Sequence, residues 1–250
     1  MGTVPGHSFG KFSPEKTLVF WLHGGAFMLP AAPDIHHRTV ARLCKSLDAC
    51  GFMPDYRLAP EFSFPAGLDD CMEAYFSVIT QGFNPKNILL IGDSAGGNLM
   101  FGLMQRLRNK GMEQPSCAVA ISPVAELARA TNTPSLYLKR YKDPLLPLAA
   151  MPQLAELYFR GKDGFNPELS PLYMDCSGLP PLFFLTSSNE ILMDDIVTLA
   201  ERCEGAGVNT LCQVWPELPH DFPIFSRLFP EALTALEDIA HFATQHLQTN

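Results

Sequence analysis

The chain lacks the features that mark membrane-spanning, exported or nucleic-acid-binding proteins. Its longest apolar runs fall far short of the roughly 20 residues that cross a bilayer. Residues 1–16 contain no apolar segment of the kind that a signal peptide needs. No cluster of Lys or Arg interrupts a formal net charge of -8, which disfavours nucleic acid and anionic membranes as partners. We therefore expect no integral membrane segment and no nucleic-acid partner.

Cysteines that could form an obvious disulfide or metal framework are also missing. The chain has seven cysteines, an odd number, and none lies in a C-x-x-C pair or a Cys/His metal-binding spacing. Such a pattern is typical of reduced, mostly buried thiols. We expect a cytoplasmic protein without a metal site.

The chain does contain a regular alternation of apolar runs and amphipathic segments. With 250 residues, 47% hydrophobic and 18% charged, it is suited to a single globular domain over 1–250. Short apolar runs predict strands at 17–22, 48–56, 87–91, 117–121, 182–186 and 210–215. Helical patterns cover 35–47, 66–81, 97–110, 149–160, 194–206 and 231–247. This alternation predicts an α/β fold with a mostly parallel central sheet flanked by helices.

One connection interrupts the alternation. Residues 124–181 separate two predicted strands by far more chain than a crossover helix needs, and they contain many prolines. Long insertions in a compact domain are commonly lids or binding elements, although simple packing over the sheet would also account for this one. We expect the insertion to form part of a lid or cap.

The most informative motif is Gly92-Asp93-Ser94-Ala95-Gly96, a G-x-S-x-G sequence between a predicted strand and a predicted helix. Glycines on both sides permit the sharp turn that exposes a nucleophilic serine, known as the nucleophile elbow of α/β-hydrolases. A serine hydroxyl needs a base to accept its proton, and a carboxylate to orient that base. In this fold the acid and then the histidine follow the serine in the chain.

Only three histidines follow Ser94, and two of them fall on the predicted C-terminal helix. His220 instead lies in a loop after the last predicted strand, at the edge of a parallel sheet where ligands bind. Glu190 falls in the loop after strand 182–186, so we predict it as the acid. Asp194 is the alternative acid, although a carboxylate in a first helical turn is favourable there without catalysis.

The remaining requirement is an oxyanion hole, a set of N–H groups that bind the negative oxygen of the tetrahedral intermediate. Residues 23–27 (HGGAF) follow the first predicted strand and resemble the H-G-G-G-type loop of lipases and esterases. Taken alone, this sequence is equally compatible with a glycine-rich turn that has no catalytic role. We predict Gly25, Ala26 and Ala95 as the donors.

Together these motifs resemble the hormone-sensitive-lipase-like esterases of the α/β-hydrolase fold, over residues 17 to about 245. The resemblance is carried by 23–27 (HGGAF), 55–61 (DYRLAPE), 64–66 (FPA), 69–70 (DD), 92–97 (GDSAGG), 170–172 (SPL) and 179–181 (LPP). It implies Ser94 as nucleophile, His220 as base and a structural role for Arg57 through pairing with carboxylates. It also implies hydrolysis of short- to medium-chain acyl esters, without cofactor or metal.

The sequence departs from the family pattern in three places. Glu190 stands where the family usually has Asp, and Ala26 replaces the third glycine of the loop. Residues 1–16 are too few for the N-terminal cap helices and hairpin of the family. We therefore expect a reduced N-terminal cap, a more open site, and an exposed sheet edge through which a homo-oligomer could form.

Other functions remain compatible with these motifs. The same triad could hydrolyse an amide or formamide instead of an ester, and sequence does not separate these substrates. The fold also serves as a ligand-binding module when its triad is lost, but both Ser94 and His220 are present here. A catalytically weak member that is stable only as an oligomer is a further alternative.

Overall fold

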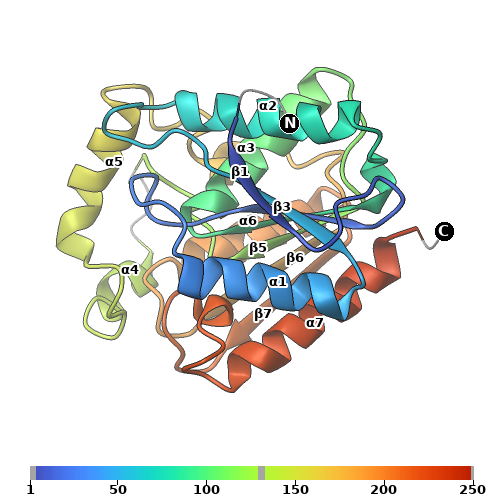
Figure 1. The fold of residues 1–250 in the computed structure, drawn as a ribbon. Helices are drawn as coiled ribbons and strands as arrows, with labels where there is room; N and C mark the ends of the chain where they lie inside the picture. Colours follow the sequence, from blue (N-terminus) through green and yellow to red (C-terminus); the bar gives the residue numbers. More distant parts are fainter. Residues whose placement is uncertain (1–3, 129–132, 249–250) are drawn as a thin grey trace.

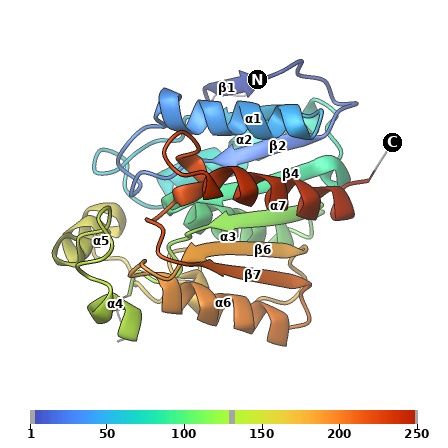
Figure 2. The same ribbon diagram turned by 90° about the horizontal axis from the view of Figure 1, so that it is seen from below.

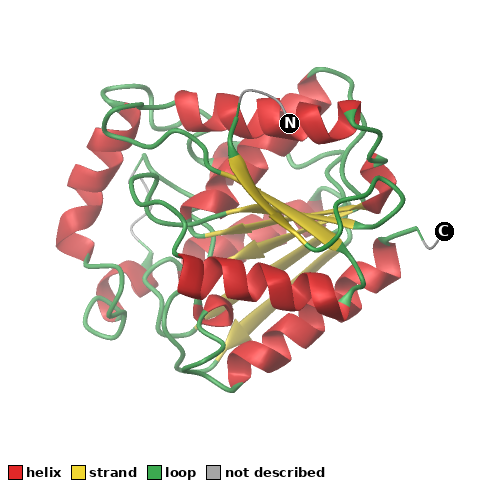
Figure 3. Ribbon diagram, viewed as in Figure 1, coloured by secondary structure: helices red, strands yellow, loops and turns green. Residues whose placement is uncertain are grey.

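The computed structural model describes residues 4–128 and 133–248, and it contains one seven-stranded sheet between two layers of helices (Figures 1 and 3). The strand order is β1-β3-β2-β4-β5-β6-β7, and only β1 runs antiparallel to its neighbour. The strands are β1 (Gly6–Phe9), β2 (Leu18–Leu22), β3 (Cys50–Pro54), β4 (Ile88–Asp93), β5 (Cys117–Ile121), β6 (Leu182–Ser187) and β7 (Thr210–Trp215). The predicted α/β fold with a mostly parallel sheet is confirmed.

Helices cover both faces of the sheet. They are α1 (Arg38–Ser46), α2 (Ala66–Thr80), α3 (Ala95–Asn109), α4 (Pro134–Leu138), α5 (Met151–Phe159), α6 (Met193–Gly205) and α7 (Glu231–His246). Buried residues of α1 and α7 pack on one face, and those of α2, α3 and α6 pack on the other. Figure 2 shows α4 and α5 set apart from these layers, beyond the ends of the strands. None of the helices in the described ranges combines the length and apolarity needed to span a bilayer.

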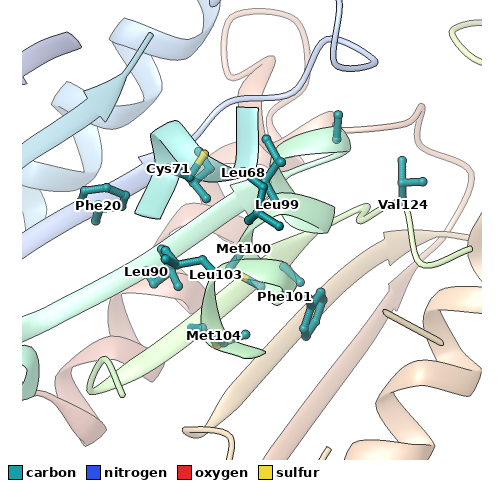
Figure 4. Close-up of a cluster of buried hydrophobic side chains, with 14 of the residues drawn as sticks. Phe20, Leu68, Cys71, Leu90, Leu99, Met100, Phe101, Leu103, Met104 and Val124 are labelled. Carbon is teal, nitrogen blue, oxygen red and sulfur yellow. The ribbon is translucent and has the colours of Figure 1, made fainter. Parts of the chain in front are cut away.

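The central strands are buried on both sides, which explains their uninterrupted apolar sequence. In β2, Phe20 packs into the cluster under α2 and α3, whereas Val19 and Trp21 pack into the cluster under α1 and α7. This alternation follows from the two-residue period of a strand. Figure 4 shows side chains of the first cluster, in which Leu90 of β4 lies beside Leu103 of α3. The sheet therefore gives the loops at its strand ends a rigid base.

Two elements have no counterpart among the predictions. Strand β1 has only four residues, three of them exposed, and its sequence GHSF lacks an apolar run. It is held by antiparallel pairing with β3, an interaction between segments over 40 residues apart in sequence. Helix α4 is a five-residue helix that follows Thr133. Neither element has the length that local periodicity requires for detection.

The cysteines and the long connection also have defined places. All seven cysteines are free, and six of them are buried. The connection 124–181 contains α4 and α5, while its residues 129–132 lie outside the described part of the chain.

The structural ion pair predicted for Arg57 is present. The Arg57 guanidinium donates to both oxygens of Asp70 at 2.7 to 3.0 Å.

Candidate active site

Ser94 lies in a sharp turn between β4 and α3. Its backbone has φ 50° and ψ -116°, outside the regions that serine normally adopts. Backbone hydrogen bonds hold the turn, since the Ser94 N–H donates to Ile121 O at 2.9 Å and Ser94 O accepts from Val124 N–H at 3.1 Å. The serine is therefore presented at the carboxyl end of the central strand by a conformation that the surrounding structure enforces.

The flanking glycines make this turn sterically feasible. A Cβ atom on Gly96 would lie 1.9 Å from the carbonyl oxygen of Leu22, and one on Gly92 would lie 2.4 Å from Gly96 O. Both obstacles are backbone atoms of the sheet and helix, which cannot move aside without disturbing the fold. The absence of a side chain at these positions allows α3 to begin directly beside β2.

We predict that Gly96→Ala lowers the free energy of unfolding by at least about 3 kcal/mol, because overpacking here would displace backbone. Denaturant unfolding followed by circular dichroism measures the change. Gly205→Ala is the matched control, since a Cβ atom at that position would have no atom within 4 Å, and helix propensity should raise stability slightly. Equal stability of Gly96→Ala and wild type would contradict the proposed steric role.

Ser94, His220 and Glu190 form a continuous chain of hydrogen bonds. The Ser94 Oγ atom lies 2.9 Å from His220 Nε2, and His220 Nδ1 lies 2.8 Å from Glu190 Oε2. All three side chains are buried. They come from three separate loops, after β4, β6 and β7, that meet at one end of the sheet. The structure thus brings together the three residues predicted as nucleophile, base and acid.

Glu190 is held firmly in position. Its second oxygen, Oε1, accepts hydrogen bonds from Ser122 Oγ at 2.8 Å, Thr186 Oγ1 at 3.1 Å and Ser187 N–H at 2.7 Å. Three donors on one oxygen fix the orientation of the carboxyl group and leave Oε2 to face the imidazole. Asp194, the alternative acid, instead accepts from the Ser135 N–H at 2.7 Å and is not in the hydrogen-bond chain.

The environment of His220 favours its protonated form. Burial alone lowers the pKa of the imidazole, but the nearby carboxylates of Asp221 and Glu190 outweigh it, and the pKa lies well above its ordinary value. A raised pKa strengthens the imidazole as a base once it is neutral. The hydrogen bond to Glu190 also places the remaining proton on Nδ1, which leaves the Nε2 lone pair directed at Ser94.

The predicted oxyanion loop has an unusual backbone. Gly25, Ala26 and Phe27 have φ values of 117°, 53° and 63°, so three successive residues adopt positive φ. The Gly24 N–H donates to Asp93 Oδ2 at 2.8 Å and serves the turn. Ala26 and Phe27 of this loop line one pocket with Ser94, the residue before Ala95, the third predicted donor.

The Asp93 carboxylate holds the oxyanion loop in place through its hydrogen bond with the Gly24 N–H. In addition to Gly24, this buried carboxylate accepts from Trp21 Nε1 at 2.6 Å and contacts His36 Nε2 at 3.2 Å. Burial raises the pKa of Asp93, but His36 and the other donors reverse the effect, and the carboxyl pKa is lowered overall. His36 keeps a raised pKa despite burial because of Asp93. This network ties the nucleophile turn to the oxyanion loop.

The network also contains site residues that the sequence predictions did not include. Trp21 and His36 belong to a strand and to a short π-helix (Pro33–His37), with no local motif that marks either as part of the site. Ser122 has φ 43° and bridges Glu190 and the backbone N–H of Asp221. A polar residue directly after an apolar run is the sequence signal that marks Ser122.

An apolar pocket opens beside the serine. The space between its walls, which includes open solvent, is about 390 Å³. Its walls are Ala26, Phe27, Ser94, Val124, Leu127, Leu146, Met151, Leu154 and Ala155. The last six residues belong to the connection 124–181. A second hollow shares Leu127, Met151 and Ala155 with this pocket, so the two adjoin. The site can therefore hold an apolar group within reach of Ser94.

Comparison with known proteins places these features in a family. Residues 19–224 match the model of the alpha/beta hydrolase fold family. An esterase of Acinetobacter venetianus is 34% identical over 242 residues, which cover 96% of this chain and 79% of that protein. The esterase LipU of Mycobacterium tuberculosis is 36% identical over 233 residues, covering 91% and 77%.

Solved structures agree with the sequence comparison. A hormone-sensitive lipase from a metagenome library superposes with a TM-score of 0.91 at 32% identity, covering 98% of this chain and 84% of that structure. An esterase from the bacterial hormone-sensitive lipase family gives 0.89 at 29% identity, covering 99% and 86%. The chain belongs to the hormone-sensitive-lipase-like esterases of the α/β-hydrolase fold.

Proposed function

We propose that the chain is a serine carboxylesterase that hydrolyses short- to medium-chain acyl esters with Ser94, His220 and Glu190 as its catalytic triad. The observation that carries this proposal is the pair of hydrogen bonds from Ser94 to His220 and from His220 to Glu190, at 2.9 and 2.8 Å. The amide-hydrolase and binding-module alternatives are not favoured, because relatives that match most of the chain are named esterases.

The proposed reaction proceeds in two halves. His220 Nε2 accepts the Ser94 hydroxyl proton as Oγ attacks the ester carbonyl carbon, and the N–H groups of Gly25, Ala26 and Ala95 bind the resulting oxyanion. Collapse of the tetrahedral intermediate breaks the bond to the alcohol, which takes the proton from Nε2 and leaves an acyl-Ser94 ester. Water, deprotonated by His220, then attacks this ester and regenerates the free serine.

The apolar pocket supports the proposed preference for short- to medium-chain acyl groups. Its walls offer only carbon-rich contacts beyond Ser94, so each methylene of a short acyl chain gains burial energy there. Its continuation towards the second hollow is interrupted by Leu127, Met151 and Ala155. Chains that outgrow the first pocket must displace one of these side chains.

We predict that kcat/KM for p-nitrophenyl butyrate exceeds that for the acetate by about tenfold, because two buried methylenes contribute about 1.6 kcal/mol. The octanoate should fall below the butyrate. Initial rates on the three esters measure the preference, and butyryl p-nitroanilide tests the amide alternative. Highest activity on acetate would exclude this pocket as the acyl site, and faster cleavage of the anilide would favour the amidase.

Three further features remain proposals. The connection 124–181 acts as part of a lid, which is supported by the contribution of Met151 and Leu154 to the pocket wall. A homo-oligomer forms through an exposed sheet edge, which sedimentation velocity would test. The cytoplasmic location rests on the free thiols.

A further inference from the structure

A second carboxyl group contacts the catalytic nitrogen of His220. Asp221 Oδ2 lies 3.1 Å from His220 Nε2, close to the 2.9 Å between that nitrogen and Ser94 Oγ. The side chain is buried, and its residue adopts φ 56° at the start of a short 3-10 turn. The Asp221 N–H donates to Ser122 Oγ at 3.2 Å, which fixes this backbone beside the triad. Asp221 therefore contacts a reacting atom of the proposed mechanism.

The two contacts compete for one lone pair. Because His220 Nδ1 hydrogen bonds to Glu190, the neutral imidazole has only the Nε2 lone pair to offer on its other side. A carboxylate cannot donate to that lone pair, so a favourable contact with Asp221 needs one proton. It resides either on Nε2, which then donates to Asp221, or on Asp221, which then donates to Nε2. In either state Nε2 cannot accept the proton of Ser94.

The surroundings favour retention of this proton. The neighbouring titratable groups are Asp93 and Glu190, both carboxylates, and His36, which interacts electrostatically with Asp221. Within the described ranges, no hydrogen-bond donor of the protein reaches the other Asp221 oxygen, Oδ1, which is buried. A buried carboxylate with so few donors is costly when ionised. Burial, with the two carboxylates, raises the pKa of Asp221 to about 7.

We propose that Asp221 is a second carboxyl partner of His220 that holds a proton on the His220–Asp221 pair near neutral pH and so gates activation of Ser94. Release of that proton to solvent frees the Nε2 lone pair. Once ionised, Asp221 stabilises the imidazolium that forms when His220 takes the Ser94 proton. The gate makes the enzyme less active under mildly acidic conditions than a triad without Asp221.

The proposed gate predicts the direction in which kcat/KM changes with pH. The proton-bound pair is inactive, so kcat/KM rises with pH as the pair loses its proton. With Asp221 present, the midpoint of this rise lies above the ordinary histidine value of about 6.5. Removal of the carboxyl group removes the attraction that holds the proton, so the midpoint moves to lower pH. A shift of one pH unit changes the relative rate about tenfold below both midpoints.

The test compares pH profiles of kcat/KM for p-nitrophenyl butyrate between pH 5 and 9 in wild type, Asp221→Gly and Asp221→Asn. Glycine suits the positive φ, and asparagine keeps the side-chain size without a titratable proton. Asp48→Gly is the matched control, because Asp48 also has a positive φ (46°) and its carboxylate is exposed on an ion pair with Lys16. We expect the midpoint to fall by about one pH unit or more in both Asp221 variants and to stay in place in the control.

Because this role depends on the proposed triad, Ser94→Ala is measured in parallel. An inactive Ser94→Ala together with an unchanged midpoint in both Asp221 variants would overturn the gate and leave the triad intact. Activity that survives in Ser94→Ala would overturn the triad itself. A purely structural role for Asp221 would lower the plateau or the melting temperature without moving the midpoint, and this result would also overturn the proposal.

Discussion

Replacement of Ser94 by alanine should lower kcat on p-nitrophenyl butyrate by roughly five to six orders of magnitude, as loss of the nucleophile does in serine proteases. The attacking Oγ atom is removed, so no acyl-enzyme can form, while the remaining site can still polarise the ester. Alanine keeps the Cβ atom that already occupies the strained turn at φ 50°. The fold should therefore be preserved.

Initial rates, measured beside far-ultraviolet circular dichroism and the melting temperature, separate catalysis from folding. Ser46→Ala is the matched control, because that hydroxyl donates to the Leu43 carbonyl within its own helix, away from the triad. The control should keep wild-type kcat. A folded Ser94→Ala enzyme with more than a few per cent of wild-type turnover would show that another group is the nucleophile.

Glu190→Gln should lower kcat by about four orders of magnitude, as the equivalent loss of the carboxylate does in chymotrypsin-like enzymes. The three donors at Oε1 will hold the amide oxygen of the new side chain, which turns its NH2 group towards His220 Nδ1. Nδ1 must then accept that hydrogen bond, so the imidazole proton moves to Nε2. In that tautomer His220 cannot accept the Ser94 proton.

Asp194→Asn provides the control for this prediction. Asp194 has the same charge and lies four residues further along, but its carboxylate accepts from Ser135 N–H outside the triad. Its kcat should stay within about twofold of wild type, the range of effects below about 0.5 kcal/mol. Full activity in Glu190→Gln combined with a large loss in Asp194→Asn would assign the acid to Asp194 instead.

Much of this architecture was predictable because the fold places its chemistry at strand ends. Ser94, Glu190 and His220 each follow an apolar run that local periodicity identifies as a strand. Parallel strands bring their carboxyl ends to one edge, so residues spread over 126 positions in sequence converge. The predicted strands 117–121 and 210–215 have the observed bounds. The first is a buried parallel strand with clear apolar boundaries, whereas the second is a partly exposed strand at the edge of the sheet.

The parts that could not be predicted depend on long-range contacts. Strand β1 is polar and short, and it exists through its pairing with β3. Trp21 joins the site because the sheet places β2 beside β4, and His36 joins it because the short helix Pro33–His37 packs against Asp93. Asp221 adjoins His220 in sequence, but adjacency does not indicate that its carboxyl group turns back towards Nε2. Such contacts are set by tertiary packing, for which a single sequence carries no local signal.

The central claim is that Ser94 forms a covalent acyl-enzyme, and mass spectrometry of the trapped enzyme tests it most directly. The protein is treated with diethyl p-nitrophenyl phosphate, which phosphorylates an activated serine, and is then digested and sequenced by tandem mass spectrometry. The account predicts one diethylphosphoryl group, located on Ser94, with loss of esterase activity in proportion to labelling. Inactivation with the group on another residue, or full labelling with esterase activity retained, would contradict it.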